Sequence, residues 1–425
     1  MSDLAANFPR RQFLKRTAQA SAIFLAPQVI PGAALGKDGA VAPSERITLG
    51  GIGIGGRGSH DLKCFMDEPG VQFVGIADSR AERRQAVKAT ADKKYGNSDC
   101  ATYRDLRELL ARSDIDAVLI ATGDRWHTMA SITAAKAGKD IYCEKPCSMT
   151  MAESRALADT IRRYGRVYQA GTQRRNIGNF IFAAELALTG KLGKLHTVHA
   201  NTQNPPTSHE WLAAEEEPPK DIVDWDMWLG PCPWRPYNKA YVAGRWRGHF
   251  DFHGGGILEW GAHTVDLCQW ASNSDNTAPV EYVPEGTGVN CRYANGVKLV
   301  MRDKGWLGLG TCSARYEGDE GWIETGDSGK YELQPESLRV KGKVFTEPGT
   351  SPTYHIRDFL RCVRTRATPK SNASVTCQSH IACHAAYIAW QLNRKLMFDP
   401  VKEEFVGDEE ANRMRSRAMR EPWRV

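Results

Sequence analysis

The sequence has no Cys-x-x-Cys pair, no internal repeat and no apolar run long enough to cross a bilayer. Its eleven cysteines are an odd number, spread along 425 residues. Four of them lie within apolar runs, where cysteine usually packs as a small hydrophobic residue: Cys143, Cys268, Cys312 and Cys362. The sequence therefore predicts buried thiols and no disulfide framework.

A large excess of charge is also missing. The formal net charge is +6, and residues 1–36 carry +3 of it, from four basic residues against one acidic residue. The small remainder argues against a nucleic-acid partner. Because the chain is too long for one ordinary core, we expect two domains after residue 36.

The first 36 residues have the pattern of an export signal. Arg10-Arg11-Gln12-Phe13-Leu14-Lys15 is a twin-arginine motif, and a weakly apolar stretch interrupted by Pro27 and Pro31 follows it. We expect residues 1–36 to be a twin-arginine signal segment, and the protein to be periplasmic or otherwise exported without a stable membrane span. A chance arginine pair in a disordered N-terminus is the alternative.

Residues 47 to 58 form the motif around which the next domain is organised. A β-type run ends in Gly53-x-Gly55-x-x-Gly58, and apolar residues at helical spacing follow. In such a turn the glycines permit the bend, the approach of a pyrophosphate and close packing of the helix. Asp78 ends the next strand, 20 residues beyond Gly58, where a ribose-binding carboxylate is expected. The pattern predicts a dinucleotide site.

Strand-like and helical segments alternate up to about residue 172. Apolar runs at 71–77, 116–122, 140–144 and 166–170 are separated by segments with helical periodicity. This alternation predicts an α/β fold with a doubly wound parallel sheet, a Rossmann domain, over residues 37–172.

Residues 173–425 have a different pattern. The irregular stretch from 203 to 247 holds five tryptophans, which favours an ordered covering loop. Strand-like segments from 280 to 345, with Asn295-Gly296 as a hairpin turn, lie between helical segments. We expect an α+β domain with a large open, mostly antiparallel sheet, and a homo-oligomer, dimer or tetramer, formed through that sheet.

Cys143-Glu144-Lys145-Pro146 follows the fifth predicted strand, at the sheet edge where ligands bind. A partly desolvated lysine at this edge is placed to act as acid or base on a substrate hydroxyl. By itself the pattern fits a surface lysine before a turn equally well.

Glu259 and His263 lie four residues apart in a predicted helix that follows Gly254-Gly255-Gly256. They share one helix face, so a carboxylate and an imidazole can bind a polyol together and share a proton. Asp266 is spaced to orient the imidazole. A surface ion pair is the alternative, but the glycine-rich entry lets a ligand approach and favours a functional site.

His380 and His384 show a zinc-like spacing on a helix, without the glutamate of a metalloprotease or an evident third ligand. Their neighbours are apolar, so we expect core histidines and no metal site.

These motifs resemble the Gfo/Idh/MocA family, which includes glucose–fructose oxidoreductase and inositol dehydrogenase. The similarity covers about residues 46 to 425 and rests on the glycine turn, Asp78, Trp126-His127, Glu144-Lys145-Pro146, residues 171–175, residues 224–231 and the helix with His263. With the leader, it resembles an exported branch of that family. Two positions depart from the family pattern: Glu259, where many members have Asp, and Gly123-Asp124-Arg125, where Pro-Asp-His is more frequent.

The resemblance implies a Rossmann domain, a C-terminal sheet domain and NAD-linked hydride transfer at a secondary carbon of a sugar, glycoside or cyclitol. It implies Lys145 as the catalytic acid or base, with His263 and Glu259 beside it. The cofactor would contact Gly53, Ile54, Gly55, Gly56, Arg57, Gly58, Asp78, Ser79, Arg80, Thr122, His127, Glu144 and Lys145. The carbohydrate would contact Gln173, Arg174, Trp246, Glu259 and His263.

NAD is the expected cofactor, because the Asp78 carboxylate repels a 2′-phosphate, although Arg80 leaves some room for NADP. Free cofactor is scarce outside the cytoplasm, so we expect it to be tightly bound and recycled in the site. Two other functions stay open. One is an NAD-dependent glycoside-cleaving enzyme that acts by transient oxidation and elimination. The other is a non-catalytic protein that binds cofactor or sugar.

Overall fold

The computed structural model describes residues 41–202 and 210–424, so the twin-arginine leader lies outside the described residues. The segment up to Arg46 is a unit separate from Ile47–Val425 and contains a short 3₁₀ turn at Pro43–Glu45. The elements below belong to the second unit. Among the described helices, none is both long and apolar enough to cross a membrane.

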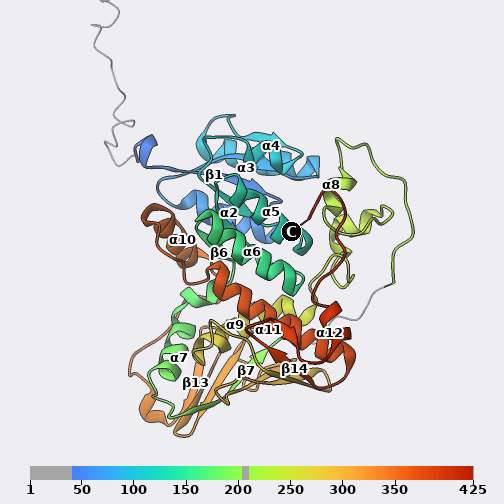
Figure 1. Cartoon of the computed structure of the whole chain (residues 1–425). Coiled ribbons are helices and arrows are strands. Elements are labelled where there is room, and N and C mark those ends of the chain that lie inside the picture. Colours follow the sequence, from blue (N-terminus) through green and yellow to red (C-terminus); the bar gives the residue numbers. More distant parts are fainter. Residues whose placement is uncertain (1–40, 203–209, 425) are drawn as a thin grey trace, which may run out of the picture. The chain divides into compact units, whose positions relative to one another are not determined.

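The first sheet is the predicted parallel one (Figure 1). Its strand order is β3-β2-β1-β4-β5-β6, with bounds β1 Ile47–Ile52, β2 Val71–Ala77, β3 Ala101–Tyr103, β4 Ala117–Ile120, β5 Asp140–Cys143 and β6 Tyr168–Ala170. Its connecting helices are α2 Gly56–Asp67, α3 Ala81–Tyr95, α4 Leu106–Leu110, α5 Asp124–Lys136 and α6 Met151–Tyr164. The strand order reverses between β1 and β4, which is where ligands bind in such sheets.

The second sheet has the order β13-β12-β11-β7-β10-β9-β8-β14-β15. Only its β7–β10 pair is parallel among the described strand pairs, so the mostly antiparallel prediction is confirmed. The bounds are β7 Leu195–Asn201, β8 Glu281–Glu285, β9 Gly288–Arg292, β10 Lys298–Arg302, β11 Ala314–Gly318, β12 Gly321–Thr325, β13 Tyr331–Gln334, β14 Leu396–Asp399 and β15 Glu404–Phe405. The predicted Asn295-Gly296 turn joins β9 to β10, which pair in antiparallel fashion.

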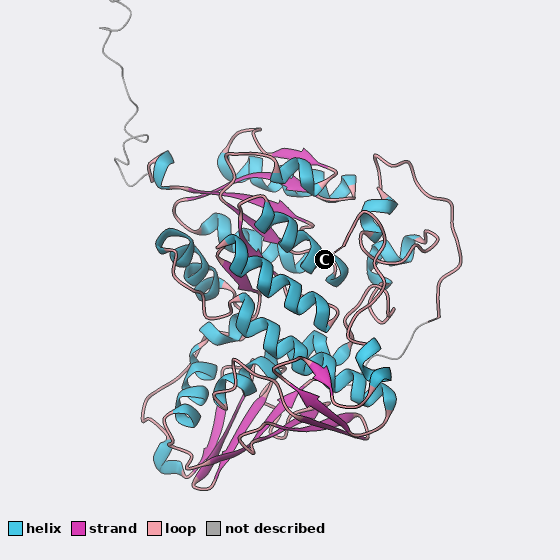
Figure 2. Cartoon of the chain, viewed as in Figure 1, coloured by secondary structure: helices cyan, strands magenta, loops and turns pink. Residues whose placement is uncertain are grey.

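Three helices pack on one face of this sheet (Figure 2): α7 Gly178–Leu188, α9 Gly256–Ala271 and α11 Ala373–Leu392. Helix α10, Thr353–Thr365, instead returns to the first sheet, where its Phe359 packs against Phe65 and Tyr142. The remaining short elements are α8 Trp225–Leu229, α12 Glu409–Arg413, the 3₁₀ turns Gln173–Asn176 and Glu336–Leu338, and a π-turn at Tyr241–Arg245.

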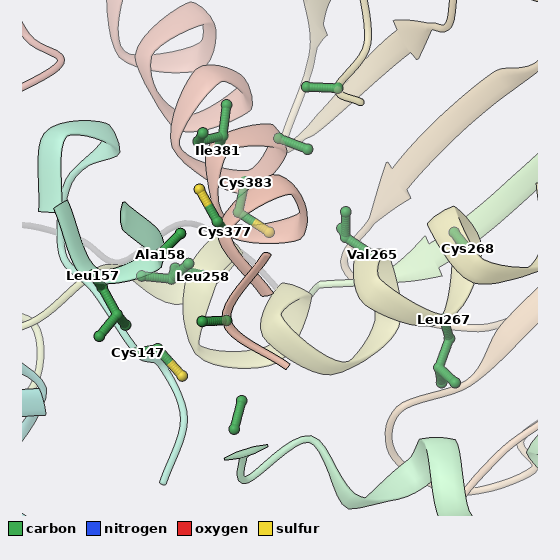
Figure 3. Close-up of a cluster of buried hydrophobic side chains, with 14 of the residues drawn as sticks. Cys147, Leu157, Ala158, Leu258, Val265, Leu267, Cys268, Cys377, Ile381 and Cys383 are labelled. Carbon is green, nitrogen blue, oxygen red and sulfur yellow. The ribbon is translucent and has the colours of Figure 1, made fainter. Parts of the chain in front are cut away.

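One buried cluster joins the two sheets. Figure 3 shows side chains of α6, α9 and α11 within it, including Leu157, Leu258 and Ile381. Each such side chain contributes roughly 1.5–3 kcal/mol when fully removed from water. All eleven cysteines lie in the described residues as free thiols, and the four predicted to be buried are buried. The cluster holds α9 next to the carboxyl end of β5.

The tryptophan-rich segment is ordered over its described part, residues 210–247, and packs together with the residues that follow it up to 252. Trp225, Trp228, Tyr241 and Phe252 form their own buried cluster. The segment is also attached to the turn after β2: Asp224 N donates to Ser79 O over 2.9 Å, and Ala81 N donates to Ile222 O over 2.9 Å. The predicted covering loop is therefore hydrogen-bonded to the residues that follow β2 of the first sheet.

Candidate active site

A cavity of about 500 Å³ opens at the carboxyl edge of the first sheet. The glycine turn, the ends of β2, β4 and β5, the Gln173 turn, helix α9 and the tryptophan-rich segment line it. The structure brings all the predicted cofactor, catalytic and substrate residues to this cavity except one. The exception is Ile54, whose side chain is buried in the core beneath the turn; its contact with the cofactor stays a prediction.

The glycine turn has the shape of a phosphate cradle. Gly53 has a positive φ of 66°, and a Cβ there would lie 2.2 Å from Thr122 Cγ2. A Cβ on Gly58 would lie 2.6 Å from the Cβ of Ala121. Around Gly55, by contrast, the space is open, and no side chain caps the first turn of α2. The free N–H groups of that helix end therefore face the cavity, which fits a pyrophosphate.

Asp78 lies at the end of β2, as predicted. Its carboxylate accepts a hydrogen bond from Arg80 N over 2.9 Å, and burial raises the pKa of Asp78 to about 6. The Arg80 guanidinium donates to Val242 O and to Glu82, each over 2.9 Å. Arg80 is thus tied to the covering segment, while Asp78 is available to ribose hydroxyls.

Glu144 belongs to a charged cluster beneath the glycine turn. Arg57 Nε lies 3.4 Å from Glu144 Oε1, and Arg57 Nη2 lies 3.1 Å from Asp61 Oδ1. Burial and the charge of Glu144 raise the pKa of Asp61 well above its usual value. The Glu144 carboxylate therefore fixes the position of the Arg57 side chain beneath the glycine turn.

Lys145 extends from the end of β5 to helix α9. Its Nζ donates to Glu259 O and to Glu259 Oε1, each over 2.9 Å. An ammonium has three N–H donors, so one is left for a ligand in the cavity. This contact joins the first sheet to the C-terminal domain at the predicted catalytic residue.

Glu259 also binds a histidine that the sequence patterns did not reveal. Its Oε2 accepts a hydrogen bond from His253 Nε2 over 2.9 Å, and His253 Nδ1 accepts one from Gly248 N over 3.2 Å. Burial alone would raise the pKa of Glu259, but His253 and Lys145 hold that pKa well below its usual value. The predicted hydrogen-bonding pair of Glu259 and His263 is therefore wrong, because Lys145 and His253 occupy the two oxygens of the carboxylate. A usable signal existed, because His253 directly precedes the three glycines that open α9.

Asp124, His253 and Glu259 bring three possible metal-ligand atoms within 4.8 Å of one another. Their ligand atoms are already engaged, because His253 donates to Glu259 and Gly254 N donates to Asp124 Oδ2 over 3.1 Å. The Lys145 ammonium supplies the positive charge. The donor set therefore fits an ion-pair network better than a metal ion.

His263 is buried in α9 and faces the same cavity. Burial and the charges of Arg174 and Lys145 hold its pKa well below the usual value, so the imidazole is neutral. Its Nδ1 is buried without a hydrogen-bond partner among the described residues. Asp266 does not orient this ring, as its spacing had suggested, but accepts from Arg175 Nε over 2.6 Å.

Two family models match the chain. One describes the NAD-binding Rossmann fold of an oxidoreductase family and matches residues 47–172; the other describes that family's C-terminal alpha/beta domain and matches residues 207–425, more than half of the chain. The chain belongs to the Gfo/Idh/MocA oxidoreductase family.

Curated relatives match a shorter region of this Gfo/Idh/MocA protein. An alpha-N-acetylgalactosaminidase of Shewanella oneidensis is 33% identical over 172 residues, which cover 37% of this chain and 38% of that protein. A glycosyl hydrolase family 109 protein of Saccharopolyspora erythraea is 33% identical over 127 residues, 29% of this chain and 27% of that protein. The matches thus span less than two fifths of these relatives.

Solved structures share the fold over most of the chain. The WlbA dehydrogenase of Bordetella pertussis, solved with NADH and UDP-GlcNAcA, has a TM-score of 0.60 at 17% identity, covering 83% of this chain and 99% of that chain. A myo-inositol 2-dehydrogenase of Lactobacillus plantarum has a TM-score of 0.60 at 16% identity, covering 83% and 100%. At such identities the likeness shows the fold alone.

Gln173, Arg174 and Trp246, the residues predicted to contact the carbohydrate, also line the cavity of this Gfo/Idh/MocA protein. Arg174 donates to both carboxylate oxygens of Asp327, over 2.8 and 2.7 Å. Gln173 Oε1 and Arg174 Nη1 are buried and have no hydrogen-bond partner among the described residues. An acceptor and a donor left free on consecutive residues of the cavity wall suit hydroxyl groups, which both donate and accept.

His127 also borders the cavity, but its ring contacts the main chain. Its Nδ1 lies 2.5 Å from Pro146 O, and its Nε2 lies 3.2 Å from Thr122 O. It thus links the ends of β4 and β5 next to Lys145. His380 and His384 are also engaged, with Cys147 N at 3.0 Å and Ser148 Oγ at 3.3 Å respectively.

Proposed function

We propose that this Gfo/Idh/MocA protein is an NAD-dependent oxidoreductase that moves hydride to or from a secondary carbon of a sugar, glycoside or cyclitol. The observation that carries the proposal is that Lys145 and His263, from different domains, border one cavity together with the glycine turn. A nicotinamide dinucleotide bound at that turn would supply the hydride chemistry.

Residues of the chain bind the cofactor, transfer the proton and orient the substrate. The free N–H groups of α2 and the open space at Gly55 bind the diphosphate, and Asp78 binds ribose hydroxyls. Lys145 moves the proton at the reacting oxygen, because its ammonium donates two N–H groups to Glu259 and keeps a third for a ligand. The neutral His263 holds the same oxygen, while Gln173 and Arg174 orient neighbouring hydroxyls.

NAD is favoured over NADP, because the Asp78 carboxylate repels a 2′-phosphate and Arg80 is engaged with Val242 O and Glu82. Slow release of the cofactor is supported by the covering segment, which hydrogen-bonds to Ser79 and Ala81 beside the cofactor site. We infer a cofactor that stays bound through repeated turnovers.

A glycoside-cleaving activity is the second candidate, favoured by relatives named as glycosyl hydrolase family 109 proteins, one of them an alpha-N-acetylgalactosaminidase. Oxidation at one sugar carbon acidifies the neighbouring C–H, elimination then releases the aglycone, and water addition with reduction restores the sugar. The same residues serve both reactions. Net redox change is absent in this case, whereas a dehydrogenase consumes or forms NADH.

The experiment starts with mass spectrometry of nucleotide released from the purified protein, followed by a screen of sugars and glycosides. NADH formation at 340 nm supports the dehydrogenase. Glycoside cleavage in D₂O with deuterium at the carbon next to the oxidised one, and no net NADH, supports the alternative. Full turnover by Lys145→Ala would remove the proton-transfer assignment.

Two further proposals concern the setting of the enzyme. The twin-arginine motif supports export to the periplasm. Replacing Arg10 and Arg11 by lysine should abolish that export, as measured by cell fractionation.

The second sheet has its helices on one face (Figure 2), which supports a dimer or tetramer formed through the other face. Light scattering of the purified protein tests that assembly.

A further inference from the structure

Arg125 is a buried cation in the wall of the cavity without an anionic partner. It is 4% exposed, and among the described residues no carboxylate lies within ion-pair distance of it; Asp124 and Asp78 act on its charge only from farther away. Lys145 and Arg174, which border the same cavity, are each paired with a carboxylate. Burying an unpaired charge is costly, so a guanidinium in this state indicates a missing anion.

The surroundings of Arg125 hold its guanidinium in a fixed place. Its Nε donates to Trp228 O over 2.7 Å, and its Cζ lies 3.5 Å from the centroid of the Trp228 ring. Its Nη1 is buried without an acceptor among the residues that the structure describes. The aromatic contact offsets part of the desolvation cost, yet burial still lowers the pKa of Arg125 to about 10.

Gly123 makes room for this arrangement. A Cβ at Gly123 would lie 2.5 Å from Arg125 Nη1, so any side chain there would displace the guanidinium. Gly123 is also the N-cap of α5, a helix of 13 residues, and no side chain caps its first N–H groups. Two independent features, a free helix N-terminus and an unpartnered buried guanidinium, therefore meet at one point of the cavity wall.

We propose that Arg125 and the N-terminus of α5 form an anion subsite that takes a phosphoryl group of the bound dinucleotide. The inference rests on the proposed function, because it needs a dinucleotide in the cavity. The phosphoryl group has two possible sources: the diphosphate common to NAD and NADP, or the 2′-phosphate of NADP. Arg125 would then determine how tightly the cofactor is held.

The test compares the wild-type chain with Arg125→Met, which keeps an apolar side chain on Trp228, and with Arg125→Lys, which keeps the charge. The probes are ADP-ribose, 2′-phospho-ADP-ribose and adenosine, titrated by calorimetry into protein freed of co-purified nucleotide. We expect Arg125→Met to bind the phosphorylated probes roughly 10- to 100-fold more weakly, with adenosine unchanged, and Arg125→Lys to be intermediate. Arg245→Met is the matched control, since Arg245 is exposed and does not line the cavity.

The outcomes separate the possibilities. Equal losses for both ADP-ribose probes support the diphosphate, and a loss for the 2′-phosphorylated probe alone supports the 2′-phosphate. No loss, or an equal loss for adenosine, overturns the subsite and leaves Arg125 as a structural link to Trp228. If the wild-type chain binds neither ADP-ribose probe, the cofactor assignment itself fails, and this inference fails with it.

Discussion

His253 Nε2 donates a hydrogen bond to Glu259 Oε2 over 2.9 Å, while the other oxygen of that carboxylate accepts from Lys145. The acceptor role of His253 Nδ1 toward Gly248 N fixes the tautomer, with the proton on Nε2. His253 is therefore a donor that holds Glu259 in position, and through it Lys145.

Replacing His253 with leucine should lower kcat by roughly 10- to 100-fold, because a hydrogen bond to a charged group is lost. The acid limb of the pH profile should move to higher pH, because His253 is one of the groups that hold the pKa of Glu259 down. Kinetics across pH in wild-type, His253→Leu, Glu259→Gln and the double variant check this. If His253 acts through Glu259, its loss adds little once Glu259 is changed; additive losses would contradict that role.

Glu259→Asp should also reduce kcat, although it keeps the negative charge. A side chain shorter by one methylene cannot keep both the 2.9 Å contact with Lys145 and the 2.9 Å contact with His253. We expect a loss of roughly tenfold, with nucleotide content unchanged. Activity equal to that of the wild type would mean that the two contacts are not needed together.

Much of this architecture could be predicted because its signals are local. The alternation of strands and helices, the glycine turn and the position of Asp78 can each be identified from residues that are close together in the sequence. The contacts that shape the site are not local: Lys145 meets Glu259 across 114 positions, and Arg125 meets Trp228 across 103. Helical spacing correctly put Glu259 and His263 on one cavity wall. It could not show that the Glu259 carboxylate would bond to Lys145, which follows β5, and to His253.

Short elements were missed for a related reason. Strands β3, β14 and β15 have two to four residues each, too few for a readable alternation. They form because longer neighbouring strands offer them a hydrogen-bonding edge. The return of α10 to the first sheet likewise depends on tertiary packing around Phe359.

Gly55→Val should abolish dinucleotide binding without unfolding the protein. No atom lies within 4 Å of a Cβ at Gly55, and its φ of −96° suits any residue, so the side chain would simply fill the cradle. We expect at least a 100-fold weaker affinity for NADH by calorimetry and an unchanged melting temperature. Gly58→Val is the contrast, because its Cβ would lie 2.6 Å from that of Ala121 and should cost roughly 1–3 kcal/mol of stability.

Asp224→Ala should accelerate cofactor release. Asp224 caps α8 by accepting from Met227 N over 3.0 Å and lies 3.2 Å from Arg104 across the cavity edge. Losing the cap and the ion pair loosens the covering segment, so we expect NADH to dissociate several-fold faster in fluorescence displacement. Asp221→Ala, at an exposed position in the same segment, should leave the rate unchanged. Equal rates in all three proteins would show that the segment does not retain the cofactor.

His380 should make the fold sensitive to mild acid. Its Nε2 accepts from Cys147 N over 3.0 Å, two residues beyond Lys145, and burial lowers its pKa from 6.5 to about 4. Between those values the unfolded chain binds a proton that the folded chain does not, so stability falls as pH drops below about 6.5. His380→Gln keeps an acceptor for Cys147 but cannot titrate. Between pH 7.5 and 5.5 the wild type should therefore lose about 1 kcal/mol more unfolding free energy than the variant, measured by urea denaturation. The other buried histidines and Asp78 titrate alike in both proteins, so identical pH dependences would show that His380 does not stay neutral in the folded state.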